Sequence, residues 1–251
     1  MSSSPSPSSS SSSPLEAARA RLDAAVARVR FVFAGMRVLS QEPACPHCYT
    51  SDELALLRTP DAVLPDSLMR HFFHESPGLI DNFDEVVRRL LPQFAAYLAG
   101  GRFSGMGYAQ SGLGRVDWRN WPRGQAEAIE EFIEAWWLDF LRDDSSPHAV
   151  ADVLEVASDM AGRVTPLLAL WAAEPRGGRA DALLECFVES RLDDLLQDDP
   201  TVLGFWCDRQ DLVAELQQWL VDHAVDRLTE YGTDDDTIIE LLHLTLPRTS
   251  R

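Results

Sequence analysis

The chain has 251 residues, a formal net charge of −18, 45% hydrophobic and 25% charged residues. These fractions are ordinary for a globular protein, and the length allows one large domain or two small ones. The negative charge repels phosphate backbones and anionic lipid headgroups, so we expect neither nucleic acid nor a membrane as a partner. All 22 basic residues are arginine, which excludes pyridoxal-phosphate enzymes and P-loop nucleotidases because both need a lysine.

Residues 1–14 are almost entirely serine and proline. Such a segment cannot bury enough apolar area to offset the entropy of ordering, so we expect it to be disordered. It has no basic stretch and no apolar stretch of the kind found in secretory signals. We therefore expect a cytoplasmic protein.

The first half of the chain carries helical patterns with recognisable ends. Apolar residues recur at alternating spacings of three and four from Leu15 to Leu39, which predicts one long amphipathic helix. Thr50 and Glu53 form a capping-box pattern ahead of a short helix that ends at Arg58. Further helices are expected from 66 to 76 and from 81 to 99, the second kinked or split at Pro92.

Residues 100–117 are rich in glycine and predict a flexible connection. Pro122 suits the first turn of a strong amphipathic helix that follows it. Helical patterns then continue to the end of the chain, at 146–160, 164–171, 181–196, 210–231 and 237–246.

No stretch alternates between apolar and polar residues with a period of two, and runs of β-branched residues are scarce. The sequence therefore predicts an all-α protein, as a multi-helix bundle or an irregular helical array. Helix pairs after residue 122 recur at a loose period of about thirty residues, which leaves an α-solenoid as an alternative. We expect a helical part at 15–99, the connection at 100–117 and a helical part at 118–246 to form one compact unit.

Cys45-Pro46-His47-Cys48 is the motif with the clearest chemistry. The same four residues form the active site of DsbA-like disulfide oxidoreductases, and this resemblance implies that Cys45 attacks and Cys48 resolves a mixed disulfide. A second hypothesis is structural zinc bound by Cys45, Cys48, His71 and His74, with the two histidines on one helical face. The third is that both cysteines are small, partly buried turn residues.

Seven tryptophans are a second unusual feature, and two of them, Trp136 and Trp137, are adjacent. On a helix their side chains point about 100° apart, so both cannot be central to one core face. They predict either an exposed aromatic anchor or a ligand pocket, against the alternative of a broadly buried helix.

The chain resembles a family of uncharacterised bacterial helical proteins in two sets of features. One set is the Cys-x-x-Cys with Glu53, the helix around Arg70 and the segment DNFDEVVRRLLP (81–92). The other is DWRNWP (117–122), which is followed by Glu127, Phe132 and Trp136. The resemblance implies an intracellular helical protein and carries no activity with it.

No set of residues with the spacing of a known catalytic site is complete in this sequence. We therefore expect a protein-interaction or binding function with a protein partner, and a structural zinc site at the Cys-x-x-Cys stays one of the three hypotheses for that motif. The alternative is a thiol-disulfide oxidoreductase that uses Cys45 and Cys48.

Overall fold

The computed structural model describes residues 13–40, 44–45, 47–74, 79–101, 112–144, 146–197, 199–203 and 210–245. Throughout these ranges the regular structure is helical, and the only β-type pairing is an isolated antiparallel bridge between Ala44 and Ile80. The predicted all-α class is confirmed. The tail at 1–12 and most of the glycine-rich connection, 102–111, lie outside the described residues, so their predicted flexibility stays a prediction.

Four helices form the N-terminal part: α1 (Pro14–Val32), α2 (Ser51–Arg58), α3 (Asp66–His74) and α4 (Phe83–Ala99). The predicted capping box is in place, because Thr50 and Glu53 bond reciprocally at the start of α2. Helix α4 ends at Ala99, and Gly100 is its C-cap. Helix α4 runs on through Pro92 as one element, so the expected split is wrong.

The end of α1 also differs from the prediction, because the helix stops at Val32 and not at Leu39. Gly35 adopts a positive φ of 72°, which turns the chain away from the helix axis. The backbone N–H of Val38 then donates to the carbonyl of Leu57, so the segment after α1 is tied to α2. At the other end, the Ser13 side chain caps α1 and Pro14 is its first residue, so the prediction of disorder is wrong for residues 13–14.

The rest of the chain forms α5 (Arg123–Arg142), α6 (Val150–Ala161), α7 (Thr165–Ala172), α8 (Arg179–Leu196), α9 (Gln210–Trp219), α10 (Val225–Tyr231) and α11 (Asp235–Leu242). Gly162 ends α6 in the left-handed conformation, as its position predicted. The expected single helix over 210–231 is interrupted by a π-helical segment, Leu220–Ala224.

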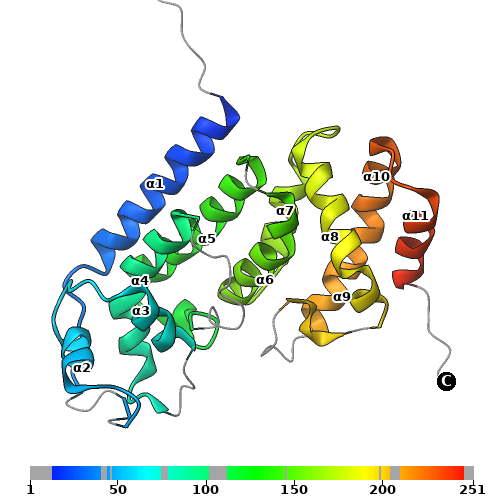
Figure 1. The fold of residues 1–251 in the computed structure, drawn as a ribbon. Coiled ribbons are helices and arrows are strands. Elements are labelled where there is room, and N and C mark those ends of the chain that lie inside the picture. Colours follow the sequence, from blue (N-terminus) through cyan, green and yellow to red (C-terminus); the bar gives the residue numbers. More distant parts are fainter. Residues whose placement is uncertain are drawn as a thin grey trace, which may run out of the picture.

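Helix α1 packs along α5 and α4, far from it in sequence, while the helices from α6 onward follow one another in a row (Figure 1). Three arginines of α1 contact carboxylates of α5 in reverse order along the chain: Arg19 with Asp139 and Asp143, Arg21 with Glu134, and Arg28 with Glu127 and Glu131. The two helices are therefore antiparallel.

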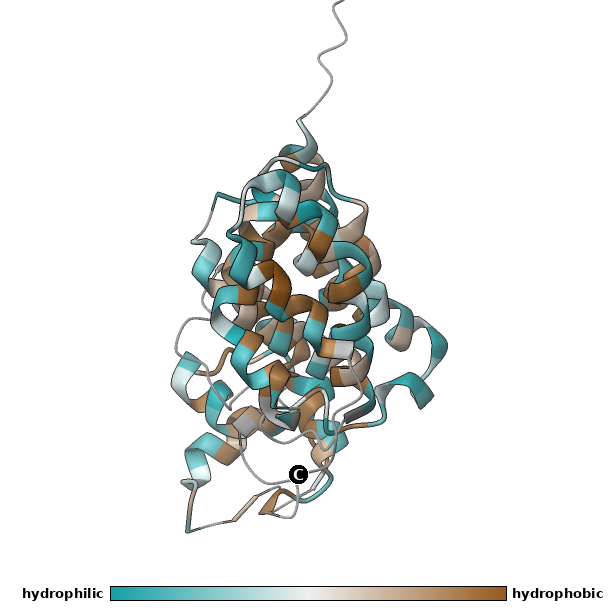
Figure 2. Cartoon of the chain, turned by 90° about the vertical axis from the view of Figure 1, so that its right-hand side faces the viewer, coloured by the Kyte–Doolittle hydropathy of each residue, from teal (hydrophilic) through white to brown (hydrophobic). Residues whose placement is uncertain are grey.

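A single cluster of buried apolar side chains extends from Leu22 in α1 to Leu244 after α11. Hydrophobic residues gather between the helices and hydrophilic ones face outward, as Figure 2 shows. The division into two helical parts that form one compact unit stays a prediction. Among the described residues, no helix is long and apolar enough to cross a membrane.

One buried ion pair connects three segments of the C-terminal half. Arg227 Nε in α10 lies 2.5 Å from Asp181 Oδ1 in α8, and both side chains are almost fully buried. Asp181 also accepts a hydrogen bond from the Gly177 backbone, and Arg227 donates to the carbonyls of Trp171, Ala172 and Pro175. The pair thus fixes the α7–α8 turn against α10.

We expect Asp181→Ala to lower the free energy of unfolding by about 3–5 kcal/mol, because it leaves the Arg227 guanidinium buried without its carboxylate. Urea unfolding followed by circular dichroism measures the change. The matched control is Glu230→Ala, which removes the carboxylate partner of Arg176 in a well-exposed pair and should cost less than about 0.5 kcal/mol. Equal losses in the two variants would contradict the structural role given to Asp181.

Glu155 in α6 gives a pH-dependent prediction. Burial raises the pKa of Glu155 to about 7; Arg191 opposes this rise, while Asp152 and Asp159 add to it. Between pH 4.5, its ordinary pKa, and 7 the folded chain binds more protons at this group than the unfolded chain. The contribution of Glu155 to the free energy of unfolding therefore falls as the pH rises through that window.

We expect Glu155→Gln to raise the free energy of unfolding by about 1–3 kcal/mol at pH 8 and to leave it unchanged below about pH 4.5. Unfolding curves at a series of pH values test this. Glu189→Gln, at an exposed position of α8, is the control, and an equal gain at pH 8 in this variant would contradict the role given to the burial of Glu155. If Glu155→Gln raised the free energy of unfolding by the same amount at every pH, ionisation of the Glu155 carboxyl would not destabilise the folded state.

Candidate functional site

The Cys45–Cys48 segment forms a tight turn ahead of α2. The Cys45 carbonyl accepts hydrogen bonds from the backbone N–H groups of Cys48, at 3.0 Å, and Tyr49, at 3.2 Å. Cys45 is half-buried, Cys48 is exposed, and both are thiols. Pro46 lies outside the described residues.

Tyr49, which the sequence analysis did not single out, anchors this turn to the core. Its ring is buried and stacks on Phe72 of α3 with centroids 4.5 Å apart and planes 9° apart. The ring of His71 lies 5.0 Å from it on the exposed side of α3. An aromatic residue directly after the second cysteine is the signal that sequence reasoning could have used.

The N-terminus of α2 is occupied by its own cap. The Thr50 side chain accepts from the Glu53 N–H, and the Glu53 carboxylate accepts from the Thr50 N–H. Both cysteines precede this cap, whereas the DsbA-like arrangement places the first cysteine at the helix N-terminus itself. Among the described residues there is also no strand to lead into the Cys-x-x-Cys.

The zinc hypothesis requires Cys45, Cys48, His71 and His74 to converge. His74 is the last residue of α3, and its side chain lies outside the described part. Among the side chains that are described, no three of the histidine, cysteine, aspartate and glutamate type come together as a metal site. Zinc at this turn stays a prediction.

A second candidate site is an open cavity of about 490 Å³ where α1, α4 and α5 meet. Its walls come from Arg19 of α1, from the end of α4 at Leu98, and from the last two turns of α5. The turn at 146–149 completes the rim. These segments are far apart in sequence, and the packing of α1 on α5 and α4 brings them together.

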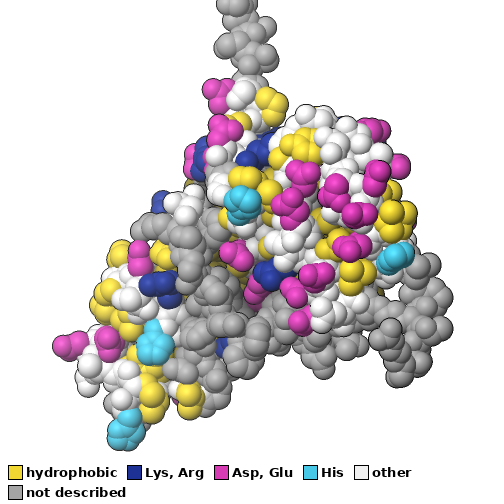
Figure 3. All heavy atoms as spheres, turned by 45° about the vertical axis from the view of Figure 1, so that its right-hand side comes forward, with side chains coloured by type: hydrophobic (Ala, Val, Ile, Leu, Met, Phe, Trp, Pro, Cys, Tyr) yellow, Lys and Arg dark blue, Asp and Glu magenta, His cyan; other side chains and the backbone are white. Residues whose placement is uncertain are grey.

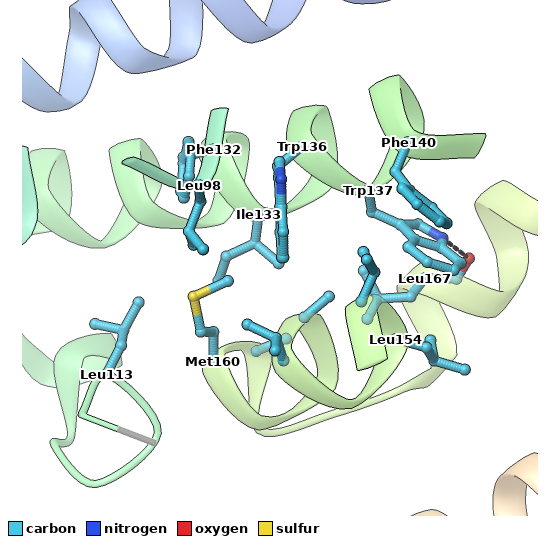
Figure 4. Packing of buried hydrophobic residues seen from close by; sticks show 14 of the residues in the cluster. Leu98, Leu113, Phe132, Ile133, Trp136, Trp137, Phe140, Leu154, Met160 and Leu167 are labelled. Atoms are coloured by element: carbon cyan, nitrogen blue, oxygen red, sulfur yellow. Dashed lines mark hydrogen bonds between the residues drawn. The ribbon is translucent and has the colours of Figure 1, made fainter. Parts of the chain in front are cut away.

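Trp136 and Phe140, one turn apart on α5, form an aromatic wall of this cavity. Trp136 is only 3% exposed and Trp137 is fully buried, so the prediction of an exposed aromatic anchor is wrong. The reason is visible in Figure 4: α5 has packing partners on more than one side, and the Trp137 indole N–H donates to the Leu167 carbonyl at 2.9 Å. Trp136 lines the cavity, Trp137 lies in the core, and a binding role for either residue stays a prediction.

Two carboxylates face the same cavity. Asp139 is 6% exposed, and Asp143 follows it by one turn at the end of α5. Arg19 Nε lies 3.2 Å from Asp139 Oδ1, and Arg19 Nη2 lies 3.2 Å from Asp143 Oδ1. The first contact lacks hydrogen-bond geometry, because Asp139 Oδ1 is a buried oxygen without a hydrogen-bond donor. Burial raises the pKa of Asp139; Arg19 opposes the rise, and Asp143 and Asp23 add to it.

Two helix C-termini add to the negative potential of the cavity. Helix α4 ends at Ala99 with no basic residue in its last turn, and α5 ends at Arg142, beside Asp143. The C-terminal end of a helix carries a partial negative charge and favours a nearby cation. The residues that line the cavity carry two carboxylates and one guanidinium, that of Arg19. A second guanidinium, that of Arg179, lies 5.8 Å from the centre of the Phe140 ring.

Comparison with protein-family models, with curated proteins and with solved structures finds no match to this chain.

Elemental analysis and a thiol count on one sample of protein, purified without a histidine tag, distinguish the three hypotheses for the Cys-x-x-Cys turn. One zinc per chain, with Cys45 and Cys48 unreactive until a chelator is added, is the expected result if the turn is a metal site. Metal-free protein whose two thiols cycle reversibly at a defined potential would instead support the oxidoreductase. Protein that holds no metal and whose thiols are inert would support the third hypothesis, in which Cys45 and Cys48 are structural turn residues.

Proposed function

We propose that this chain is a binding protein whose cavity between α1, α4 and α5 takes a basic side chain of a protein partner. The observation that carries the proposal is the buried carboxylate of Asp139, whose Oδ1 accepts no hydrogen bond, in a cavity with an aromatic wall. Pockets of a few hundred Å³ with apolar walls and a few converging polar groups are typical of binding sites.

Cationic groups suit this cavity for three separate reasons. A carboxylate with an unfilled acceptor gains a charge-assisted hydrogen bond from an ammonium or guanidinium group. The ring of Trp136, which lines the cavity, attracts the same cations. Acidic residues also gather on the surface over the C-terminal helices (Figure 3), and the chain's net charge of −18 attracts basic partners over longer distances.

The resemblance to uncharacterised bacterial proteins and the expected cytoplasmic location fit this proposal and add no activity to it. The proposal also leaves a separate structural role to a zinc ion at the Cys45–Cys48 turn. Catalysis of thiol exchange is the second candidate function, since the Cys48 thiol is exposed.

Benzylamine, which joins an ammonium group to an aromatic ring, is a suitable probe of the cavity. We expect it to bind with roughly millimolar affinity and to shift the indole signal of Trp136 in ¹H–¹⁵N spectra. Asp139→Asn should weaken the binding about tenfold, because it removes the charge that receives the ammonium group. Arg19→Gln should strengthen it, because a competing cation is lost.

The matched control is Asp144→Asn, which makes the same change of charge at an exposed residue next to Asp143 that does not line the cavity. Benzyl alcohol is the neutral control ligand. Binding of the alcohol as tight as that of the amine, or equal losses in Asp139→Asn and Asp144→Asn, would show that the cavity does not select a cation.

A further inference from the structure

A second cavity, of about 390 Å³, lies where the end of α1 and the α2–α3 loop meet α4. Two arginines line it, Arg30 from the last turn of α1 and Arg89 from α4. The apolar part of the wall is formed by Ala62, Val63, Pro92 and Ala96.

Arg89 is a buried cation without a carboxylate in direct contact. It is 5% exposed, and burial lowers its pKa, while Asp61 acts against this from a longer distance. Its Nε donates to the Thr59 carbonyl at 3.2 Å, and its Nη2 to the carbonyls of Leu56 and Ala62. Backbone carbonyls satisfy these donors but do not neutralise the charge.

The remaining nitrogen of Arg89 is available from the cavity. Nη1 makes no hydrogen bond to any described residue, and it is not one of the buried polar atoms that lack a partner. Since Arg89 lines the cavity, this nitrogen is accessible to a ligand there. Arg30 likewise forms no ion pair within the described part of the chain, although 40 acidic residues compete for 22 basic ones.

The cavity wall is held in place before any ligand arrives. Gln93 of α4 accepts from the Leu64 N–H at 2.9 Å and donates to the Leu64 carbonyl at 2.6 Å. Together with the three carbonyls bound by Arg89, these bonds fix the loop from Thr59 to Leu64 against α4. A site whose wall is already ordered loses less entropy when it binds.

The charges at the cavity set the class of ligand. Asp61 also lines the wall, and its Oδ1 accepts from the Gly35 N–H at 3.0 Å. Two guanidinium groups against one carboxylate leave one positive charge, which matches a monoanion better than a dianionic phosphate. We propose that this cavity binds a small organic carboxylate, held by Arg89 Nη1 and Arg30, with its apolar body against Val63 and Pro92.

Titration of the full-length protein with sodium isovalerate, followed by ¹H–¹⁵N spectra at constant ionic strength, tests the proposal. Isovaleramide, which has the same shape without the charge, should bind at least tenfold more weakly. Arg30→Gln should weaken isovalerate binding about fivefold, because one of two cations is lost. Arg30 is suitable for mutation because it is exposed, whereas Arg89 braces the fold.

Arg37→Gln is the matched control, since Arg37 is exposed and does not line the cavity. The affinity of the Arg37→Gln variant for isovalerate should equal that of the parent chain. Equal binding of acid and amide, equal losses in the two arginine variants, or tighter binding of inorganic phosphate than of isovalerate would each overturn the proposal.

Discussion

The burial of α5 on several sides is the constraint on which the rest of the fold depends. Trp136 and Trp137 point about 100° apart on this helix, yet both are buried. A helix that is apolar over so wide an arc needs partners on more than one side. Helices α1 and α4 cover one part of its surface, and α6, α7 and α8 cover the others. The row of later helices continues from this packing.

Local sequence signals predicted the elements well where the physical cause was itself local. The Thr50–Glu53 capping box and the left-handed Gly162 are decided by a few neighbouring residues, and both are in place. The predicted end of α1 was wrong, because the apolar spacing continues to Leu39 whereas the helix ends at Val32. Beyond Val32 the backbone leaves the helix and forms a tertiary hydrogen bond to α2. The spacing of apolar residues alone does not show where a tertiary hydrogen bond takes the chain out of a helix.

Neither cavity could be predicted from the sequence, and the reason is the same for both. Arg19 and Asp139 are 120 residues apart, and no local pattern links them. They meet because α1 packs antiparallel on α5. The sequence did single out Trp136, because two adjacent tryptophans on a helix cannot both point to the centre of one core face. It missed Arg89, because a buried arginine looks like any other arginine in a helical pattern.

Helix α1 has a part in both cavities, because it supplies Arg19 to one and Arg30 to the other. These residues are eleven positions apart, which is about 16 Å along a helix. Under the two proposals, the α1 arginine competes with a cationic ligand for Asp139 in the first cavity and attracts an anionic ligand in the second. A ligand that displaces Arg19 from Asp139 weakens one of the ion pairs that hold α1 on α5.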